Sequence, residues 1–218
     1  MAKAESFSTS PIYSILAGTG ELVRKVPAGT PGARTRQYED RETKNMVTKH
    51  EIVASRVTGK ITSINLDEGD YGMQLIVGLD EDTNDAIRVA MGCSRTNDQY
   101  AVDFMKKLPN IDLMKEVTLS PFRGEKSRVI FISQGEDKIL DAYTKYDEEA
   151  KKWVYLDIGM PQADNRRGTK EYWTDEYFPA VRKFLVEETE KSAVFGVKHA
   201  ATQNTVSDAP EATDEVPF

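Results

Sequence analysis

The chain has 218 residues, of which 39% are hydrophobic and 30% charged, and its formal net charge is −7. Such a length allows one large domain with a substantial core. No apolar run reaches the roughly 20 residues of a membrane span, and residues 1–10 lack the apolar stretch of a secretory signal, so we expect a cytoplasmic protein. One cysteine, Cys93, and two histidines exclude an internal disulfide and an all-cysteine zinc site, and we expect neither metal nor cofactor.

The charge is distributed unevenly along the chain. Residues 1–60 carry ten Lys or Arg against six Asp or Glu, whereas residues 171–218 carry four against ten. A phosphate backbone responds to the local basic surface of a protein rather than to its total charge. The negative net charge therefore does not exclude a nucleic-acid ligand.

Residues 1–50 form an N-terminal region in which we expect a strand at 13–17 and a basic loop. The loop, at residues 27–36, has two prolines and two glycines, which favour an extended and mobile backbone. Single-strand binding needs cations for phosphates and flat rings for bases. The loop supplies Arg34 and Arg36, and Tyr38 follows it, so these three residues are candidate nucleic-acid contacts.

Residues 51–135 have the pattern of a compact β-rich unit. Alternating apolar residues predict strands at 57–66, 73–79, 87–91, 117–119 and 129–132. A change of phase between Ile61 and Ile64 predicts a bulge in the first strand, and a helix from Thr96 or Asn97 to Leu108 separates the third strand from the fourth. This is the element order of the OB-fold, a five-stranded Greek-key barrel. We therefore predict a mainly β chain with helices, in which an OB-fold carries an N-terminal arm, an added hairpin and a C-terminal helix.

The outer sheet surface and the loop after the fourth strand are the usual oligonucleotide-binding surface of OB-folds. The alternation predicts that the side chains of Val57, Ile61, Leu75, Val77, Val89 and Met91 point inward. It predicts that those of Arg56, Lys60 and Arg88 point outward. The loop after the fourth strand carries Phe122, Arg123, Lys126 and Arg128. We predict DNA contacts at these outward and loop residues, although solvated charges on any sheet would have the same pattern.

Residues 136–198 are expected to extend the same domain. The pattern predicts a hairpin formed by strands at residues 139–146 and 151–158, followed by a helix at residues 174–190. Aromatic and basic residues alternate along this region, as suits a groove for a single strand, but aromatic side chains in a hairpin also serve as core. The candidate contacts are Trp153, Tyr155, Arg166 and Arg167. The apolar stripe of the helix, which we expect Thr174 to cap, is typical of core or of a subunit contact.

Residues 199–218 have four acidic and no basic side chains, a composition that predicts a disordered tail. The tail ends with two acidic residues and a phenylalanine whose ring lies beside the terminal carboxylate. A partner can bind the ring in an apolar pocket and the carboxylate with a cation. Its last residues are Asp214, Glu215, Val216, Pro217 and Phe218. This tip resembles the acidic, Pro-Phe-ending tip of bacterial single-stranded-DNA-binding proteins and the acidic tails of phage replication proteins.

The resemblance implies an OB-fold body that binds single-stranded DNA and a tail, at residues 214–218, that recruits replication or repair proteins. The chain departs from the bacterial type because it is longer and has no Gln/Gly-rich linker, and these features suggest a phage protein acting in the host cytoplasm in DNA replication, recombination and repair. Self-association stays open. We expect no catalysis, since the sequence has no Walker loop, nucleophile elbow or zinc signature. The alternative is a virion or scaffolding protein that docks through its tail.

Overall fold

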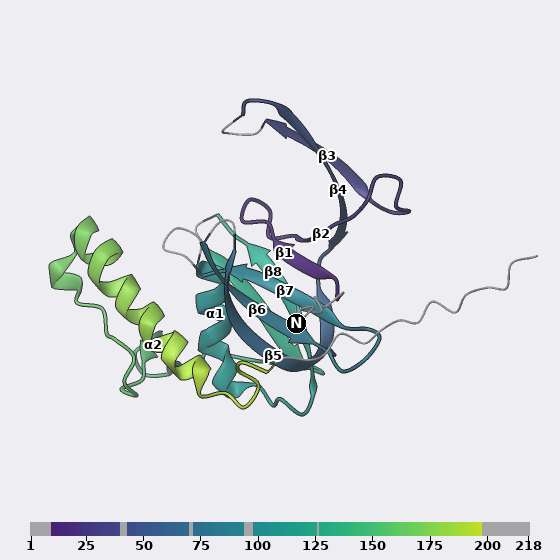
Figure 1. The fold of residues 1–218 in the computed structure, drawn as a ribbon. Helices are drawn as coiled ribbons and strands as arrows, with labels where there is room; N and C mark the ends of the chain where they lie inside the picture. Colours follow the sequence, from purple (N-terminus) through teal and green to yellow (C-terminus); the bar gives the residue numbers. More distant parts are fainter. Residues whose placement is uncertain (1–9, 40–42, 70–71, 94–97, 126, 198–218) are drawn as a thin grey trace, which may run out of the picture.

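The computed structural model describes residues 10–39, 43–69, 72–93, 98–125 and 127–197. These residues are mainly β, with two α-helices, and most strands join one large open sheet (Figure 1). The elements are β1 (Ile12–Ile15), β2 (Leu22–Lys25), β3 (Arg34–Glu39), β4 (Met46–Ala54), β5 (Val57–Gly69), β6 (Gly72–Leu79), β7 (Ile87–Gly92), α1 (Gln99–Lys107), β8 (Glu116–Arg123), β9 (Arg128–Gln134), β10 (Asp137–Lys138), β11 (Thr144–Asp147), β12 (Lys152–Tyr155) and α2 (Phe178–Glu190). The order in the ten-stranded sheet is β10-β9-β8-β5-β6-β7-β1-β2-β4-β3, and β11 pairs only with β12.

Strand β5 is shared between two halves of the sheet. Its first residues, Val57–Lys60, pair with β8, and its later residues pair with β6, which in turn pairs with β7. The register shifts between Ile61 and Ser63, which confirms the predicted bulge. Strand β5 continues in register with β6 as far as Gly69.

The core lies between the sheet and α1. The six apolar side chains predicted to point inward from the first three strands of this unit are all buried. Helix α1 packs against β7 and β9 and buries Phe104 and Met105, while Leu108 directly follows it. Full burial of a side chain such as Phe104 stabilises the fold by about 1.5–3 kcal/mol. The predicted capping residues of this helix, Thr96 and Asn97, lie outside the described residues.

The N-terminal region extends the sheet. Strand β1 pairs in parallel with β7, and β2, β4 and β3 follow it in antiparallel pairing. Figure 1 shows β3 and β4 leaving the body of the sheet as a narrow hairpin. The prediction of a loop at residues 27–36 is therefore wrong for its last three residues. Arg34 and Arg36 lie in β3, where each residue pairs with β4. The expected strand at 13–17 is β1, one residue earlier and shorter.

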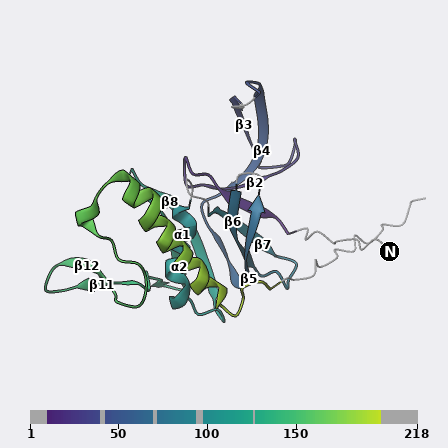
Figure 2. The same ribbon diagram turned by 60° about the vertical axis from the view of Figure 1, so that its left-hand side comes forward.

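The C-terminal extension contains a hairpin and a helix, as predicted, but the strands and the helix are shorter than the expected 139–146, 151–158 and 174–190. Strands β11 and β12 pair with Tyr146 opposite Trp153, and α2 packs against α1 (Figure 2). Thr174 does not cap the helix, because a π-helical turn at Tyr172–Tyr177 leads into α2 and contains it. Phe178, the first residue of α2, is half exposed. No helix among the described residues is long and apolar enough to cross a membrane.

Candidate nucleic-acid interface

One face of the sheet runs without interruption from β6 onto the β3–β4 hairpin. Successive side chains of a strand point to opposite faces, and paired residues on neighbouring strands point to the same face. The register of the strands therefore places on the face opposite the core Gln74, Ile76, Arg88, Ala90, Ile12, Ser14, Val23, Lys25, Glu51, Lys49, Arg36 and Tyr38. Because β3 and β4 leave the body of the sheet, this outer face is not flat (Figure 1).

A groove of about 450 Å³ lies on the outer face where β2 and β4 meet β1, β6 and β7. Its lining includes Val23, Lys25, Arg36, Lys49, Glu51 and Gln74. Three cations and one carboxylate thus line a single groove. The three cationic side chains come from β2, β3 and β4, so their proximity depends on the pairing of these strands.

The carboxylate of Glu51 organises the base of the β3–β4 hairpin. This side chain is nearly fully buried, and Arg36 donates to it from Nη2 at 2.9 Å and from Nε at 3.3 Å. Arg34 donates to Glu51 at 3.4 Å and to Glu21 at 3.1 Å. The hydrogen bond from Arg36 holds the pKa of the Glu51 carboxyl below its usual range, and it raises the pKa of Arg36 in turn. These arginines therefore orient the hairpin as well as contributing charge.

Tyr38 lies beside two of these cations on the outer face. The Arg36 guanidinium carbon is 5.3 Å from the centre of the Tyr38 ring, and Lys49 Nζ is 4.9 Å from it. Both distances are within the range of a cation–π interaction. Within the part of the chain that the structure describes, no ion pair involves Lys25 or Lys49. Their charges are available to an anionic ligand, and Tyr38 offers a ring next to Lys49.

The outward residues predicted on the barrel strands have different partners. Arg88 forms an ion pair with Glu81, a carboxylate that is 4% exposed and also accepts a hydrogen bond from Ser63, so its charge is compensated. Lys60 is half-buried on β5, and its backbone N–H donates to the Asp80 side chain at 2.9 Å. Arg56 precedes β5 and is exposed. Of these three cations, Arg56 is the most accessible.

The end of β8 lies against the turn between β1 and β2. Phe122 and Arg123, predicted in the loop after the fourth strand, are instead the last two residues of this strand. Arg123 donates to the carbonyl oxygens of Ala17, at 3.3 Å, and of Gly18. Gly20, in the left-handed conformation with φ of 77°, lies so close that an added Cβ would be 3.0 Å from the Arg123 backbone nitrogen. Arg128 is half-buried at the start of β9, whereas the predicted contact Lys126 lies outside the described residues. The end of β8 is thereby attached to the N-terminal strands that line the groove.

The predicted contacts of the extension lie on another part of the molecule. Figures 1 and 2 both show α2 on a different side of the sheet from the β3–β4 hairpin. Arg166 pairs with Asp164, and Arg167 pairs with Glu176 at 2.7 Å. The structure therefore does not bring Arg166, Arg167 and the hairpin residues into the groove.

The aromatic side chains of β12 differ in their surroundings. Trp153 is 57% exposed and packs edge-on against Tyr146. Tyr155 has Lys106 Nζ 5.8 Å from its ring centre and shares a hydrogen bond with Tyr177. Burial of Tyr177, together with Tyr155, raises the pKa of the Tyr177 hydroxyl to about 12. Tyr155 therefore anchors the hairpin to the helix, and Trp153 is the more accessible ring.

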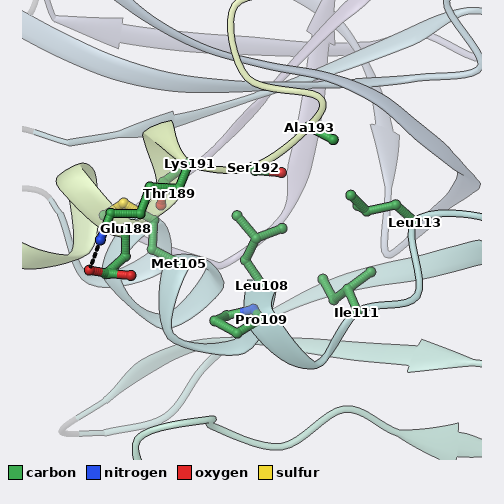
Figure 3. A pocket seen from close by; sticks show the side chains of 10 residues that line it. All are labelled: Met105, Leu108, Pro109, Ile111, Leu113, Glu188, Thr189, Lys191, Ser192 and Ala193. Atoms are coloured by element: carbon green, nitrogen blue, oxygen red, sulfur yellow. Dashed lines mark hydrogen bonds and ion pairs between the residues drawn. The ribbon is translucent and has the colours of Figure 1, made fainter. Parts of the chain in front are cut away.

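A second hollow, of about 300 Å³, lies where the ends of α1 and α2 meet (Figure 3). Its walls include Met105, Leu108 and Ile111, and the ion pair between Glu188 and Lys191 lies at its edge. No group of three or more metal-ligating side chains occurs among the described residues. This hollow is mostly apolar and its cation is compensated, so the groove on the outer face is the better candidate for an anionic polymer.

The sequence predicted Arg36 of the groove and Tyr38 beside it, but not Lys25 and Lys49. Comparison with protein-family models, curated proteins and solved structures finds no match to this chain. The tail tip at residues 214–218 lies outside the described residues. The grounds for a functional proposal are therefore the groove, the strand order and the sequence of the tail.

Proposed function

We propose that this chain binds single-stranded DNA without sequence preference and without catalysis, in the groove on the outer face of the sheet. The observation that carries the proposal is the groove lined by Lys25, Arg36 and Lys49, in which neither lysine forms an ion pair among the described residues. The ring of Tyr38 lies beside Arg36 and Lys49. Cations in a groove follow a phosphate backbone of any sequence, and an aromatic ring stacks on any base.

Strand order supports an OB-type barrel formed by β5 to β9. Strand β5 pairs with β8 at its start and with β6 afterwards, and α1 lies between β7 and β8, as in the OB-fold. The outer surface of such a barrel is the usual oligonucleotide surface. In this chain β1 to β4 would enlarge that surface, since the face continues from β6 and β7 into the groove.

The sequence of the tail supports a role in recruiting proteins rather than in binding DNA. Its acidic residues and its terminal Phe218 resemble the recruitment tips of single-stranded-DNA-binding proteins, so residues 214–218 would recruit partner proteins in phage DNA replication, recombination and repair, in the cytoplasm of the host cell. An anionic tail near a basic groove would also compete with DNA for that groove.

Binding of a fluorescent oligo-dT to the intact chain, measured by anisotropy over a range of salt concentrations, tests this function. We expect binding at low salt that weakens as the salt concentration rises. A version that stops after His199 serves as the control for competition by the tail. If neither protein binds oligo-dT at low salt, the proposal is wrong.

The alternative, a virion or scaffolding protein, is favoured by one observation. The extension exposes several large apolar side chains, namely Tyr146, Trp153, Ile158 and Phe178, each more than two-fifths accessible. Exposed apolar groups of this kind mark protein contacts when they are contiguous. This function predicts self-association or partner binding through the extension that oligo-dT does not affect.

A further inference from the structure

Two phenyl rings in contact lie exposed on the outward side of β8 and β9. Phe122 is 51% exposed and Phe131 is 41% exposed, and their ring centres are 5.7 Å apart at an angle of 44°. Each points away from the core, because the neighbouring residues of both strands, Pro121, Ile130 and Ile132, are buried. Covering such a pair by a flat apolar ligand would be favourable, since it removes apolar surface from water.

The side chains around the two rings are small and polar. Phe131 pairs with Ser120, and the next outward pair along these strands is Thr118 with Ser133. On the adjoining strand the hydroxyls of Thr58 and Thr118 share a hydrogen bond of 2.9 Å. Both rings therefore stand beside a low, hydroxyl-lined surface, which leaves their faces open to a planar group.

Cations lie on both sides of this surface. Lys138 Nζ is 5.2 Å from the centre of the Phe131 ring. Arg56 immediately follows Ser55, whose carbonyl oxygen accepts a hydrogen bond from Ser120, the pairing partner of Phe131. Among the residues that the structure describes, neither Arg56 nor Lys138 forms an ion pair. Rings flanked by uncompensated cations suit bases and phosphates better than an apolar protein surface.

The end of β8 that carries Phe122 contacts the turn that follows Leu16, a residue of the groove lining. Leu16 lines one end of the groove, and the next two residues, Ala17 and Gly18, accept hydrogen bonds from Arg123. Arg123 directly follows Phe122 in β8. A strand leaving the groove at Leu16 would thus cross Arg123 and reach Phe122.

We infer that Phe122 and Phe131 form a second stacking site, on which bases of the DNA strand rest after it leaves the groove, with Arg56 and Lys138 contacting its phosphates. The inference rests on the proposed single-stranded-DNA binding and adds a place on the protein that the groove does not include. It also predicts that the bound strand passes from β4 to β9 rather than toward the β11–β12 hairpin.

Replacing Phe131 with Leu tests the site, because Leu keeps an apolar side chain but has no ring. For an oligo-dT longer than about 16 nucleotides we expect affinity to fall by about 5- to 150-fold, the range that corresponds to the loss of one stacked base. Phe131→Trp keeps a ring, so we expect near-normal affinity and quenching of the added Trp emission by DNA. Phe178→Leu, at a half-exposed phenylalanine on α2, is the matched control and should bind normally.

The outcomes separate this site from the groove. If Phe131→Leu binds as tightly as the original protein while loss of Lys25 and Lys49 weakens binding, the stacking site is wrong and the proposed function stands. Loss of self-association in Phe131→Leu with unchanged DNA affinity would identify a protein contact and also overturn the inference. If the original protein binds no oligo-dT, both proposals fail. Circular dichroism of each variant checks that the fold is retained.

Discussion

Neutralising the two lysines of the groove should weaken DNA binding in a salt-dependent way. The variant Lys25→Gln with Lys49→Gln removes two positive charges that form no ion pair among the described residues. Both lysines are at least partly exposed, so the substitutions should change the free energy of unfolding by no more than about 0.5 kcal/mol each. A loss of binding would then reflect the lost phosphate contacts rather than a damaged fold.

The expected magnitude follows from counterion release. Each phosphate contact on a single strand contributes about 0.7 to the slope of log K against log salt concentration. Two lost contacts should reduce that slope by about 1.4, so that affinity is about 25-fold lower at 0.1 M salt and nearly unchanged at 1 M. At 0.1 M this difference amounts to about 1.9 kcal/mol.

Anisotropy titrations of oligo-dT across this salt range measure the slope directly. The control is Lys183→Gln with Lys191→Gln, which changes the net charge equally. Lys183 lies in α2 and Lys191 directly follows it, and both lysines already pair with glutamates. The control should keep the original slope. Equal slopes for the original protein and the groove variant, or an equal loss in the control, would refute the role of the groove and indicate that only the overall charge matters.

Three further predictions concern the tail, the hairpin and the extension. Deleting residues 209–218 should leave oligo-dT affinity unchanged or raise it, because a competing anion is removed; a large loss would contradict the account. Glu51→Gln should lower the free energy of unfolding, measured by urea denaturation, by about 1.5–3 kcal/mol. The difference between the variant and the original protein should shrink as pH falls below about 4.5. Arg36 keeps the pKa of Glu51 low in the folded protein, and protonation of Glu51 removes the ion pair in the original protein as well. Stability should fall as pH rises from 10 to 12, since only the unfolded chain ionises Tyr177 there, and Tyr177→Phe should reduce that fall.

The strands that contain alternating apolar residues could be predicted from the sequence. Leu75, Val77, Val89 and Met91 show the period of two that one buried face imposes, and all four are buried. The β3–β4 hairpin could not be predicted in this way, because its side chains are mostly polar and it is stabilised by pairing with β2 and by the buried Glu51. Such contacts join residues that are distant in sequence and leave no local pattern.

The candidate site was predictable only in part for the same reason. Arg36 and Tyr38 could be recognised as a basic and aromatic pair near one another in sequence. Lys25 and Lys49 join them only through the pairing of β2, β4 and β3, which sequence spacing does not reveal. Conversely, Trp153 alternates with basic residues along the chain, but the fold places its hairpin on α2's side of the sheet (Figure 2). Proximity along the chain was thus a poor guide to a shared surface.

Photo-crosslinking of an iodouracil-substituted oligo-dT to the intact protein, followed by mapping of the modified peptides, tests the location of DNA most directly. The account predicts a principal adduct at Tyr38, beside the groove, and weaker adducts at Phe122 or Phe131. These adducts should disappear when unlabelled oligo-dT is added in excess. Adducts confined to Trp153 and its hairpin, or no adduct at low salt, would contradict binding on the outer face of the sheet.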